Sequence, residues 1–148
     1  MIGYPSVDRA RPLNQRVGRK LPQIAVPLQE VPYVAFSEFE LASNLKALGA
    51  FLERRRPPEN LRSKVDLGFS IVGHTIDLFE IRPAWGNPRK TDQDRFARIR
   101  FVRTAREWRL YWMRANLKWY RYEPDHVYNS LADALKAVDD DLDGCFFG

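Results

Sequence analysis

Arginines, lysines and tyrosines that alternate with apolar residues in the second half of the chain are the side chains best suited to chemistry. Alternation along three expected strands separates a basic aromatic set: Arg98, Arg100, Arg109, Tyr111, Met113, Lys118, Tyr120 and Tyr122. Arginines neutralise phosphates and exposed rings stack on unpaired bases, as on the sheets of RNA-recognition modules. This set predicts a surface that binds nucleic acid, with Arg82 and Trp85 at its border.

The residues that alternate with this set are all apolar. They are Ala97, Ile99, Phe101, Trp108, Leu110, Trp112, Leu117 and Trp119. A strand with one apolar face turns that face toward a hydrophobic core. We therefore expect these residues to be buried and the basic aromatic set to lie in solvent or against a ligand.

The basic aromatic set has other interpretations. Antiparallel sheets commonly keep one face in water, where Arg-over-Tyr stacking and cross-strand pairs with Glu107 or Glu123 are ordinary stabilisation. Aromatic residues and arginine also anchor protein interfaces, so an acidic protein is an alternative partner. Exposed edge strands can pair between subunits, which leaves monomer and dimer both open.

Carboxylates at strand ends raise a remote enzymatic alternative. Asp66 begins one strand and Glu80 lies near the end of the next, followed by Arg82. Metal-dependent phosphodiesterases hold Mg²⁺ with carboxylates and place a cation on the transferring phosphate. Such sites normally carry lysine where Arg82 stands, and exposed strand ends explain the acids more simply.

The acidic end of the chain resembles a calcium loop without completing one. Asp139, Asp141, Asp143 and Gly144 match positions one, three, five and six of an EF-hand, but the chain ends at the tenth position, before the bidentate glutamate. We expect these acids to be solvated or to pair with arginines of the body. Cys145 lies among them, where negative charge and burial raise a thiol's pKa, so it predicts a packing residue. No catalytic residue, metal or cofactor is expected.

The first predicted element is a helix that starts at Ser37. Ser37 and Glu40 form a capping box, and Phe36 and Leu41 have the spacing of a hydrophobic staple. An apolar stripe follows at Leu41, Leu45, Leu48 and Leu52. Three arginines, residues 54–56, precede Pro57; we interpret them as helix termination, with an anion site as the alternative.

Beyond residue 66 the apolar period changes to two, which predicts strands. Segments 66–72 and 75–82 form a hairpin around Gly73 and His74, and residues 84–94 are expected to be an exposed loop. Turns at 104–106 and 114–116 divide the rest into three more strands. A last helix is expected near Ser130, with a buried stripe at Leu131, Leu135, Val138 and Leu142. The fold class is α+β: an antiparallel five-stranded β-meander with an N-terminal and a C-terminal helix packed on one face.

Length and composition set the domain organisation. A chain of 148 residues is the size of one domain, which we place at residues 37–148. Its net charge is +5. Residues 1–36 are rich in proline and arginine and predict a basic, partly disordered arm. No apolar run approaches the ~20 residues that span a bilayer, and the start lacks a signal-peptide core, so we expect a cytoplasmic protein with no membrane contact.

Several motifs together resemble those of a family of small bacterial proteins catalogued as domain of unknown function 3024. They are Arg55-Arg56-Pro57-Pro58 with Leu61-Arg62, Phe79-Glu80-Ile81-Arg82-Pro83-Ala84-Trp85, Phe101-Val102-Arg103, Trp108-Arg109-Leu110-Tyr111-Trp112-Met113-Arg114, Leu117-Lys118-Trp119 and Phe146-Phe147-Gly148. The resemblance covers about residues 37–148. It implies a bacterial, intracellular protein with a compact domain, and no assigned activity, cofactor or catalytic residue.

Overall fold

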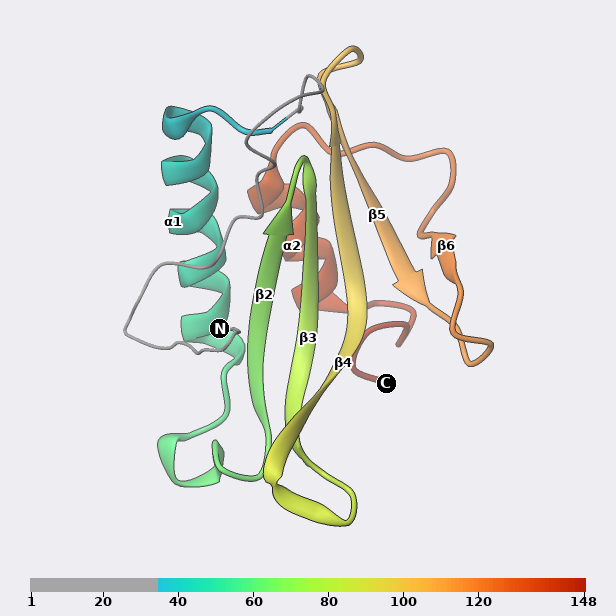
Figure 1. The fold of residues 1–148 in the computed structure, drawn as a ribbon. Helices are drawn as coiled ribbons and strands as arrows, with labels where there is room; N and C mark the ends of the chain where they lie inside the picture. The colour runs from blue at the N-terminus through green and yellow to red at the C-terminus, as the bar shows by residue number, and fades with distance from the viewer. Residues whose placement is uncertain (1–34) are drawn as a thin grey trace, which may run out of the picture. The chain divides into compact units, whose positions relative to one another are not determined.

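The structure, a computed structural model, describes residues 35–148 (Figure 1). The predicted basic arm at 1–36 falls almost entirely outside this range. The chain divides into two compact units, Phe36–Phe69 with Thr75–Gly148, and Met1–Ala35 with Ser70–His74. Of the latter unit, the structure describes Ala35 and 70–74, where a strand ends in a tight turn at Gly73.

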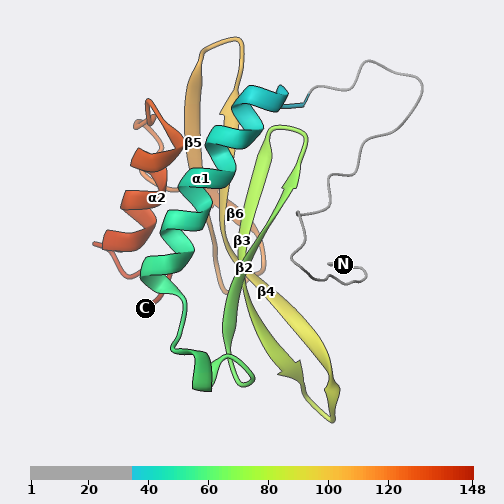
Figure 2. The ribbon, with the colours of Figure 1, turned by 90° about the vertical axis from the view of Figure 1, so that its left-hand side faces the viewer.

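Helices begin and end the described range, and five strands lie between them. The helices are α1 (Glu38–Arg55) and α2 (Leu131–Asp140), with a short 3-10 helix at Glu59–Leu61. The strands are β2 (Asp66–Val72), β3 (Thr75–Ala84), β4 (Asn87–Val102), β5 (Glu107–Met113) and β6 (Trp119–Arg121). Each strand lies beside its neighbour in sequence, in the order β2-β3-β4-β5-β6. Both helices lie on the same side of the sheet (Figure 2). The predicted α+β meander with helices on one face is confirmed. None of the described helices is long and apolar enough to cross a membrane.

The core lies between the two helices and the covered side of the sheet. Its most deeply buried side chains are Leu48 and Phe51 of α1, Ile76 and Leu78 of β3, Ile99 of β4, Leu110 of β5, and Leu135 and Val138 of α2. These positions recur at helical spacing on the helices and alternate on the strands, which is how each element presents one apolar face. The predicted core residues Ala97 and Trp108 are also buried.

The start of α1 is held by the predicted capping box. The Ser37 hydroxyl accepts a hydrogen bond from the Glu40 N–H at 3.1 Å, and the Glu40 carboxylate accepts one from the Ser37 N–H at 2.9 Å. The same carboxylate accepts from the Arg103 guanidinium at 2.7 Å. Because Arg103 follows β4, one carboxylate both caps α1 and ties it to the turn between β4 and β5.

The arginines at the end of α1 connect it to the rest of the fold. Arg54 and Arg55 pair with Asp139 of α2, at 3.0 and 3.3 Å. Arg56 caps the helix and donates twice to Asp66, which begins β2, at 2.7 Å each. The interpretation as helix termination is confirmed. The expected pairing of the acidic end with arginines holds for Asp139, whereas Asp141 and Asp143 accept hydrogen bonds from other groups.

The expected loop at 84–94 is a paired hairpin arm, so that prediction is wrong. β3 continues to Ala84 and β4 starts at Asn87, so that only Trp85 and Gly86 form the turn. Residues 87–94 are all exposed and, apart from Pro88, polar or charged, so they lack the one-sided apolar pattern from which a strand is recognised. Backbone pairing with β3, at Asn87 and from Thr91 onward, forms the strand in the absence of that pattern, and residues 88–90 bulge out of the pairing.

The C-terminal helix ends earlier than its apolar stripe predicted. The Ser130 side chain caps α2 by accepting from the Asp133 N–H, but the helix stops at Asp140 and Asp141 adopts a left-handed conformation with φ 45°. Its carboxylate then accepts hydrogen bonds from the Phe146 and Phe147 N–H groups, at 2.9 and 2.8 Å. Leu142, expected in the buried stripe, is consequently exposed.

We predict opposite effects for alanine at two glycines. A β-carbon at Gly68 of β2 would lie 2.8 Å from the ring of Phe79, which is buried, whereas a β-carbon at Gly49 of α1 meets nothing within 4 Å. Gly68→Ala should lower the free energy of unfolding by about 1–3 kcal/mol through overpacking. Gly49→Ala should raise it by about 0.5–1 kcal/mol because alanine is the better helix former. Urea denaturation of both variants measures the difference, and equal effects would contradict the packing at Gly68.

The Glu40 pair with Arg103 predicts a pH dependence of stability. The hydrogen bond from Arg103 is the main reason that the pKa of Glu40 falls from 4.5 to about 2. A carboxyl with a lowered folded-state pKa stabilises the fold above its unfolded pKa, and this contribution is lost as pH falls through the folded value. The difference in free energy of unfolding between the parent and Glu40→Gln should therefore shrink as the pH falls from about 4.5 to about 2. At neutral pH this difference should be about 1 kcal/mol or less, because solvent screens the exposed pair.

Thermal denaturation across that pH range measures the Glu40 effect. Glu53→Gln is the control for charge removal, because Glu53 is exposed on the same helix and makes no hydrogen bond or ion pair within residues 35–148. A difference between parent and Glu40→Gln that stayed constant to the lowest pH would contradict the assignment to Arg103.

Candidate functional site: the open face of the sheet

The side of the sheet that the two helices leave uncovered is here named the open face. Strand register places on it Thr75, Asp77 and Phe79 of β3, Arg95, Arg98 and Arg100 of β4, Glu107, Arg109, Tyr111 and Met113 of β5, and Trp119 and Arg121 of β6. Arginines outnumber carboxylates on this face. The prediction of a basic surface opposite the helices is therefore matched by the arrangement of the strands.

Asp77 is the centre of the open face. Its carboxylate accepts from Arg98 at 2.7 and 2.9 Å and from Arg95 at 3.1 Å. Asp77 is only 7% exposed, so its charge needs these partners to compensate for lost hydration. Both arginines keep further N–H groups that the carboxylate does not use.

A β-bulge makes this arrangement possible. Leu78 pairs with Ala97 and Phe79 pairs with Arg95, so Phe96 has no partner position on β3. In a regular strand, residues three apart point to opposite faces. The extra residue brings Arg95 and Arg98 to the same face, while the Phe96 ring lies 5.1 Å from that of Phe147.

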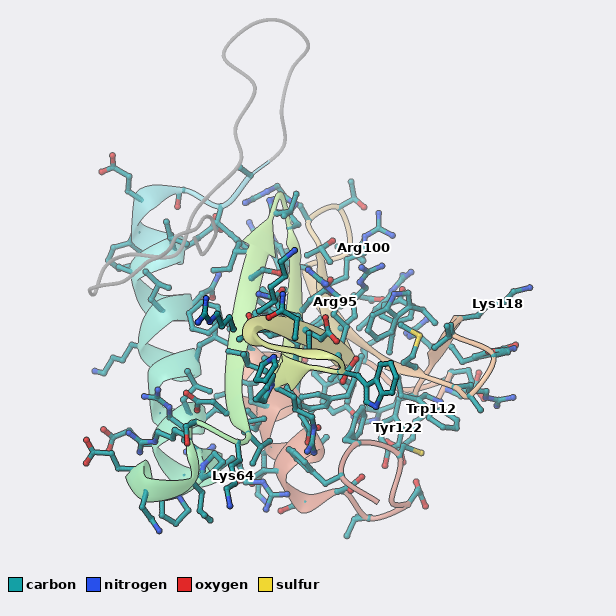
Figure 3. All side chains as sticks on the ribbon, turned by 60° about the horizontal axis from the view of Figure 1, so that its bottom comes forward. Lys64, Arg95, Arg100, Trp112, Lys118 and Tyr122 are labelled. Atoms are coloured by element: carbon teal, nitrogen blue, oxygen red, sulfur yellow. The ribbon has the colours of Figure 1, made fainter. Side chains whose placement is uncertain are left out.

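Four of the predicted ligand-binding residues do meet on the open face. Arg100 lies opposite both Thr75 and Arg109 on the neighbouring strands, and Tyr111 lies opposite Arg98. Arg109 donates to Glu107 at 2.7 Å, which raises the pKa of its guanidinium. The Arg100 side chain is exposed and makes no hydrogen bond or ion pair with any residue from 35 to 148. Figure 3 shows Arg95 and Arg100 on the same strand.

The other predicted ligand-binding residues lie elsewhere. Arg82 projects from the hairpin arm on the side opposite Arg95 and donates to Glu80 at 2.9 Å. Trp85 forms the tip of that arm and is 98% exposed. Lys118 lies in the turn before β6 and points away from the sheet (Figure 3).

Tyr120 lies on the side of the sheet that the helices cover. The side chains of β6 alternate as predicted, but each points to the face opposite the predicted one. Met113 pairs with Trp119, and Trp112 with Tyr120. Trp119 therefore lies on the open face, with the Arg98 guanidinium 4.5 Å from its ring centre, whereas Tyr122 is buried against Phe146.

The physical reason is the turn before β6. Leu117, expected in the core, has φ 62° and is 79% exposed, so the side chains do not alternate through this turn. The predictions that placed Leu117 and Trp119 in the core, and Tyr120 and Tyr122 on the basic face, are wrong for this reason.

Sequence reasoning missed Asp77, Arg95, Trp119 and Arg121. A carboxylate at Asp77, between Ile76 and Leu78 in an apolar strand, was a usable signal, because a charge at such a position requires a partner. Nothing in the sequence indicated the bulge that brings Arg95 to Asp77. Arg121 donates to the His126 carbonyl at 3.1 Å.

The carboxylates considered for metal binding are engaged in other contacts. Asp66 is bound by Arg56 and Glu80 by Arg82. Asp143 accepts from the Tyr122 hydroxyl at 2.9 Å, which together with burial raises the pKa of Tyr122. Within residues 35–148, no group of three or more His, Cys, Asp or Glu side chains could hold a metal ion.

Cys145 has the environment that the sequence predicted for it. Burial and the nearby carboxylates of Asp143 and Asp141 raise the pKa of its thiol. A thiol with a raised pKa is a poor nucleophile near neutral pH, which fits a packing residue.

The family model described as domain of unknown function DUF3024 matches residues 36–148, which confirms the expected family. No curated protein and no solved structure matches the chain.

We predict that Asp77→Asn lowers the free energy of unfolding by about 2 kcal/mol or more. The change leaves Arg95 and Arg98 without a charged acceptor, and hydrogen bonds to charged groups contribute about 1.5–3 kcal/mol. Asp92→Asn is the matched control, because Asp92 is exposed on the hairpin arm and makes no hydrogen bond or ion pair among the described residues. Urea denaturation compares the two, and equal stability would show that Asp77 does not organise the face.

Proposed function

The chain belongs to the family of the domain of unknown function DUF3024, and we propose that it is a binding module whose open face contacts single-stranded nucleic acid. The observation that carries the proposal is the convergence of Arg95, Arg98, Arg100 and Arg109 from adjacent strands on one uncovered surface. Such a surface attracts a polyanion, and phosphate contacts supply most of the affinity of non-specific binding.

Three of these arginines, Arg95, Arg98 and Arg109, are held at defined positions by carboxylates before any ligand arrives. Arg98 uses its Nε and one Nη to bind Asp77, and Arg109 uses its Nε to bind Glu107. Each guanidinium has five N–H donors, so N–H groups remain for a phosphate oxygen. Fixing side chains in advance reduces the entropy lost on binding.

Aromatic rings lie beside these cations. Tyr111 is opposite Arg98 on the neighbouring strand, and the Trp119 ring stacks beneath the Arg98 guanidinium at 4.5 Å. Unpaired bases stack on aromatic rings and on arginine planes, whereas a duplex presents its bases edge-on. The combination supports a single strand as the preferred ligand.

Salt-dependent binding of a labelled oligonucleotide tests the proposal. Arg100→Gln removes the arginine on this face that has no partner within the described part of the chain, so its loss should weaken binding and reduce the salt slope. Each phosphate contact on a single strand contributes about −0.7 to the slope of log K against log salt, so the slope should become shallower by about 0.7.

Lys46→Gln is the matched control for the loss of one positive charge, because Lys46 is exposed on α1, in the helix layer. It should leave the slope unchanged. Absence of binding at low salt, or equal slopes for Arg100→Gln and the parent, would reject the open face as the contact surface.

A protein partner is the second candidate, and the exposure of Trp85 favours it. A tryptophan that is 98% exposed at the tip of a hairpin has the character of an interface anchor. In the oligonucleotide experiment, a Trp85→Ala variant that binds like the parent would exclude this ring from the nucleic-acid contact, as the role in a protein interface requires. A weakened Trp85→Ala variant would assign it to nucleic acid.

A further inference from the structure

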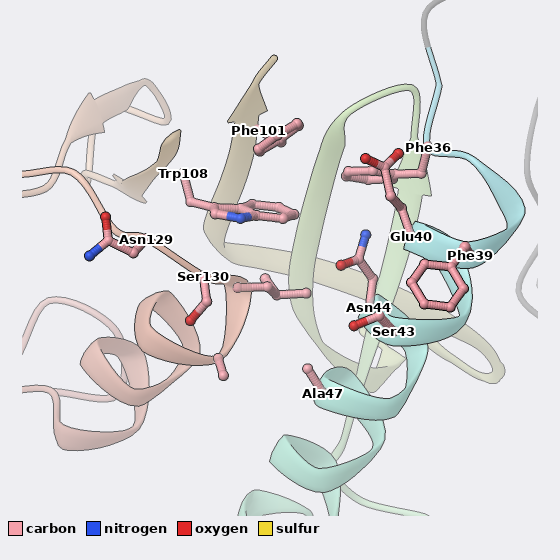
Figure 4. A pocket seen from close by; sticks show the side chains of 12 residues that line it. Phe36, Phe39, Glu40, Ser43, Asn44, Ala47, Phe101, Trp108, Asn129 and Ser130 are labelled. Atoms are coloured by element: carbon pink, nitrogen blue, oxygen red, sulfur yellow. The ribbon is translucent and has the colours of Figure 1, made fainter. Parts of the chain in front are cut away.

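A pocket of about 350 Å³ opens beside the first turns of both helices, away from the open face (Figure 4). It is lined by Phe36, Phe39, Glu40, Ser43, Asn44 and Ala47 from the start of α1, Phe101 and Trp108 from β4 and β5, and Asn129, Ser130, Leu131 and Ala132 from the start of α2. Small-molecule sites begin at about this volume and are mostly apolar with few polar groups. Seven of these twelve residues are apolar, and the other five, Glu40, Ser43, Asn44, Asn129 and Ser130, are polar or charged.

Asn44 is the polar group that distinguishes this pocket. The residue is 6% exposed, and its Nδ2 donates to no acceptor among the described residues. Figure 4 shows its side chain pointing into the space beside Trp108 and Phe36. Buried donors without a partner are rare because each lowers stability, so this amide calls for an acceptor from outside the described residues, which a water molecule or a ligand oxygen supplies.

The start of α2 adds further donors. The first N–H groups of a helix have no acceptor within it. Ser130 accepts from the Asp133 N–H, and the structure gives the N–H groups of Leu131 and Ala132 no acceptor in the described range. Both residues line the pocket, so donors approach it from two helices.

The charge of the pocket selects an uncharged ligand. Glu40 is the only ionisable residue among the lining residues that the structure describes, and its carboxylate is already bound by Arg103 and the Ser37 N–H. Its lowered pKa, about 2, keeps it ionised at neutral pH. A carboxylate ligand would face this negative charge with no cation among the described lining residues, and an amidinium cation has no acceptor for the Asn44 N–H.

The walls of the pocket select a planar ligand. The rings of Phe36 and Trp108 lie 5.7 Å apart and nearly parallel, and the ring of Phe101 lies 4.9 Å from that of Trp108. The three rings pack against one another and form a flat aromatic wall of the pocket, which suits a planar ligand better than a branched one.

We infer that this pocket binds a small, uncharged, planar molecule whose carbonyl oxygen accepts a hydrogen bond from the Asn44 side-chain amide. The site is separate from the open face and does not depend on nucleic-acid binding. Its ligand class follows from the Asn44 donor, the absence of a cation among lining residues in the range 35–148, and the aromatic wall.

Three probes of the same size and shape test the inference on the full chain. Benzamide carries a neutral carbonyl, benzoate a charged carboxylate, and benzamidine a cation without an acceptor. Titration by ¹H–¹⁵N NMR should show saturable millimolar binding of benzamide, with shifts of the Asn44 side-chain amide and the Trp108 indole signals. Benzoate and benzamidine should bind more weakly.

Two kinds of variant separate binding from folding. Asn44→Leu keeps the side-chain volume and removes the unpaired donor, so it should fold with unchanged or higher melting temperature while benzamide affinity falls about tenfold. Ala47→Leu should also block benzamide, because Ala47 lines the pocket. Ala50→Leu, the same change at an exposed position of the same helix, should not.

The competing results are distinct. Failure of benzamide to shift the Asn44 amide at saturating concentration would overturn the site. Equal benzamide affinity in Asn44→Leu would overturn the role of this amide, and tighter binding of benzoate or benzamidine would overturn the assignment to an uncharged ligand.

Discussion

The buried carboxylate of Asp77 is the constraint on which the arrangement of the open face depends. A carboxylate that is 7% exposed requires strong partners, and the structure supplies them from Arg95 and Arg98. These two residues reach it together only because a bulge at Phe96 interrupts the alternation of β4. On one face of the sheet the bulge brings both arginines to the Asp77 carboxylate. On the other face it lets the Phe96 ring pack against Phe147.

Carboxylates and arginines also connect the layers of the fold. Asp139 joins α2 to the end of α1, Asp66 joins β2 to the same end, and Glu40 joins the start of α1 to the turn after β4. Because most of these arginines are occupied, the net charge of +5 overstates the number of cations available to a ligand. Arg100 gains its importance for the proposed function from being unoccupied among the described residues.

The sequence predicted well those features that depend on near neighbours. The capping box at Ser37 and Glu40 and the end of α1 near Arg56 involve groups a few residues apart, and each was confirmed. The hairpin at Gly73 and the five-stranded meander followed in the same way from turn residues and alternation. The open face was predicted only in part: Arg98, Arg100, Arg109 and Tyr111 lie on it, and Arg82, Lys118 and Tyr120 do not.

What the sequence determined by itself was the order and type of the elements, the apolar sides of the helices and of β4 and β5, and the family, because these follow from local periodicity and composition. The tertiary structure decided the bulge beside Asp77, the phase of β6, the extension of the hairpin arm to Trp85 and the pocket around Asn44. Each of these depends on which residues of distant segments lie opposite one another. A single inserted residue, such as Phe96 in β4, or a positive φ, as at Leu117, changes the face of the sheet to which the neighbouring side chains point. The local sequence pattern stays the same.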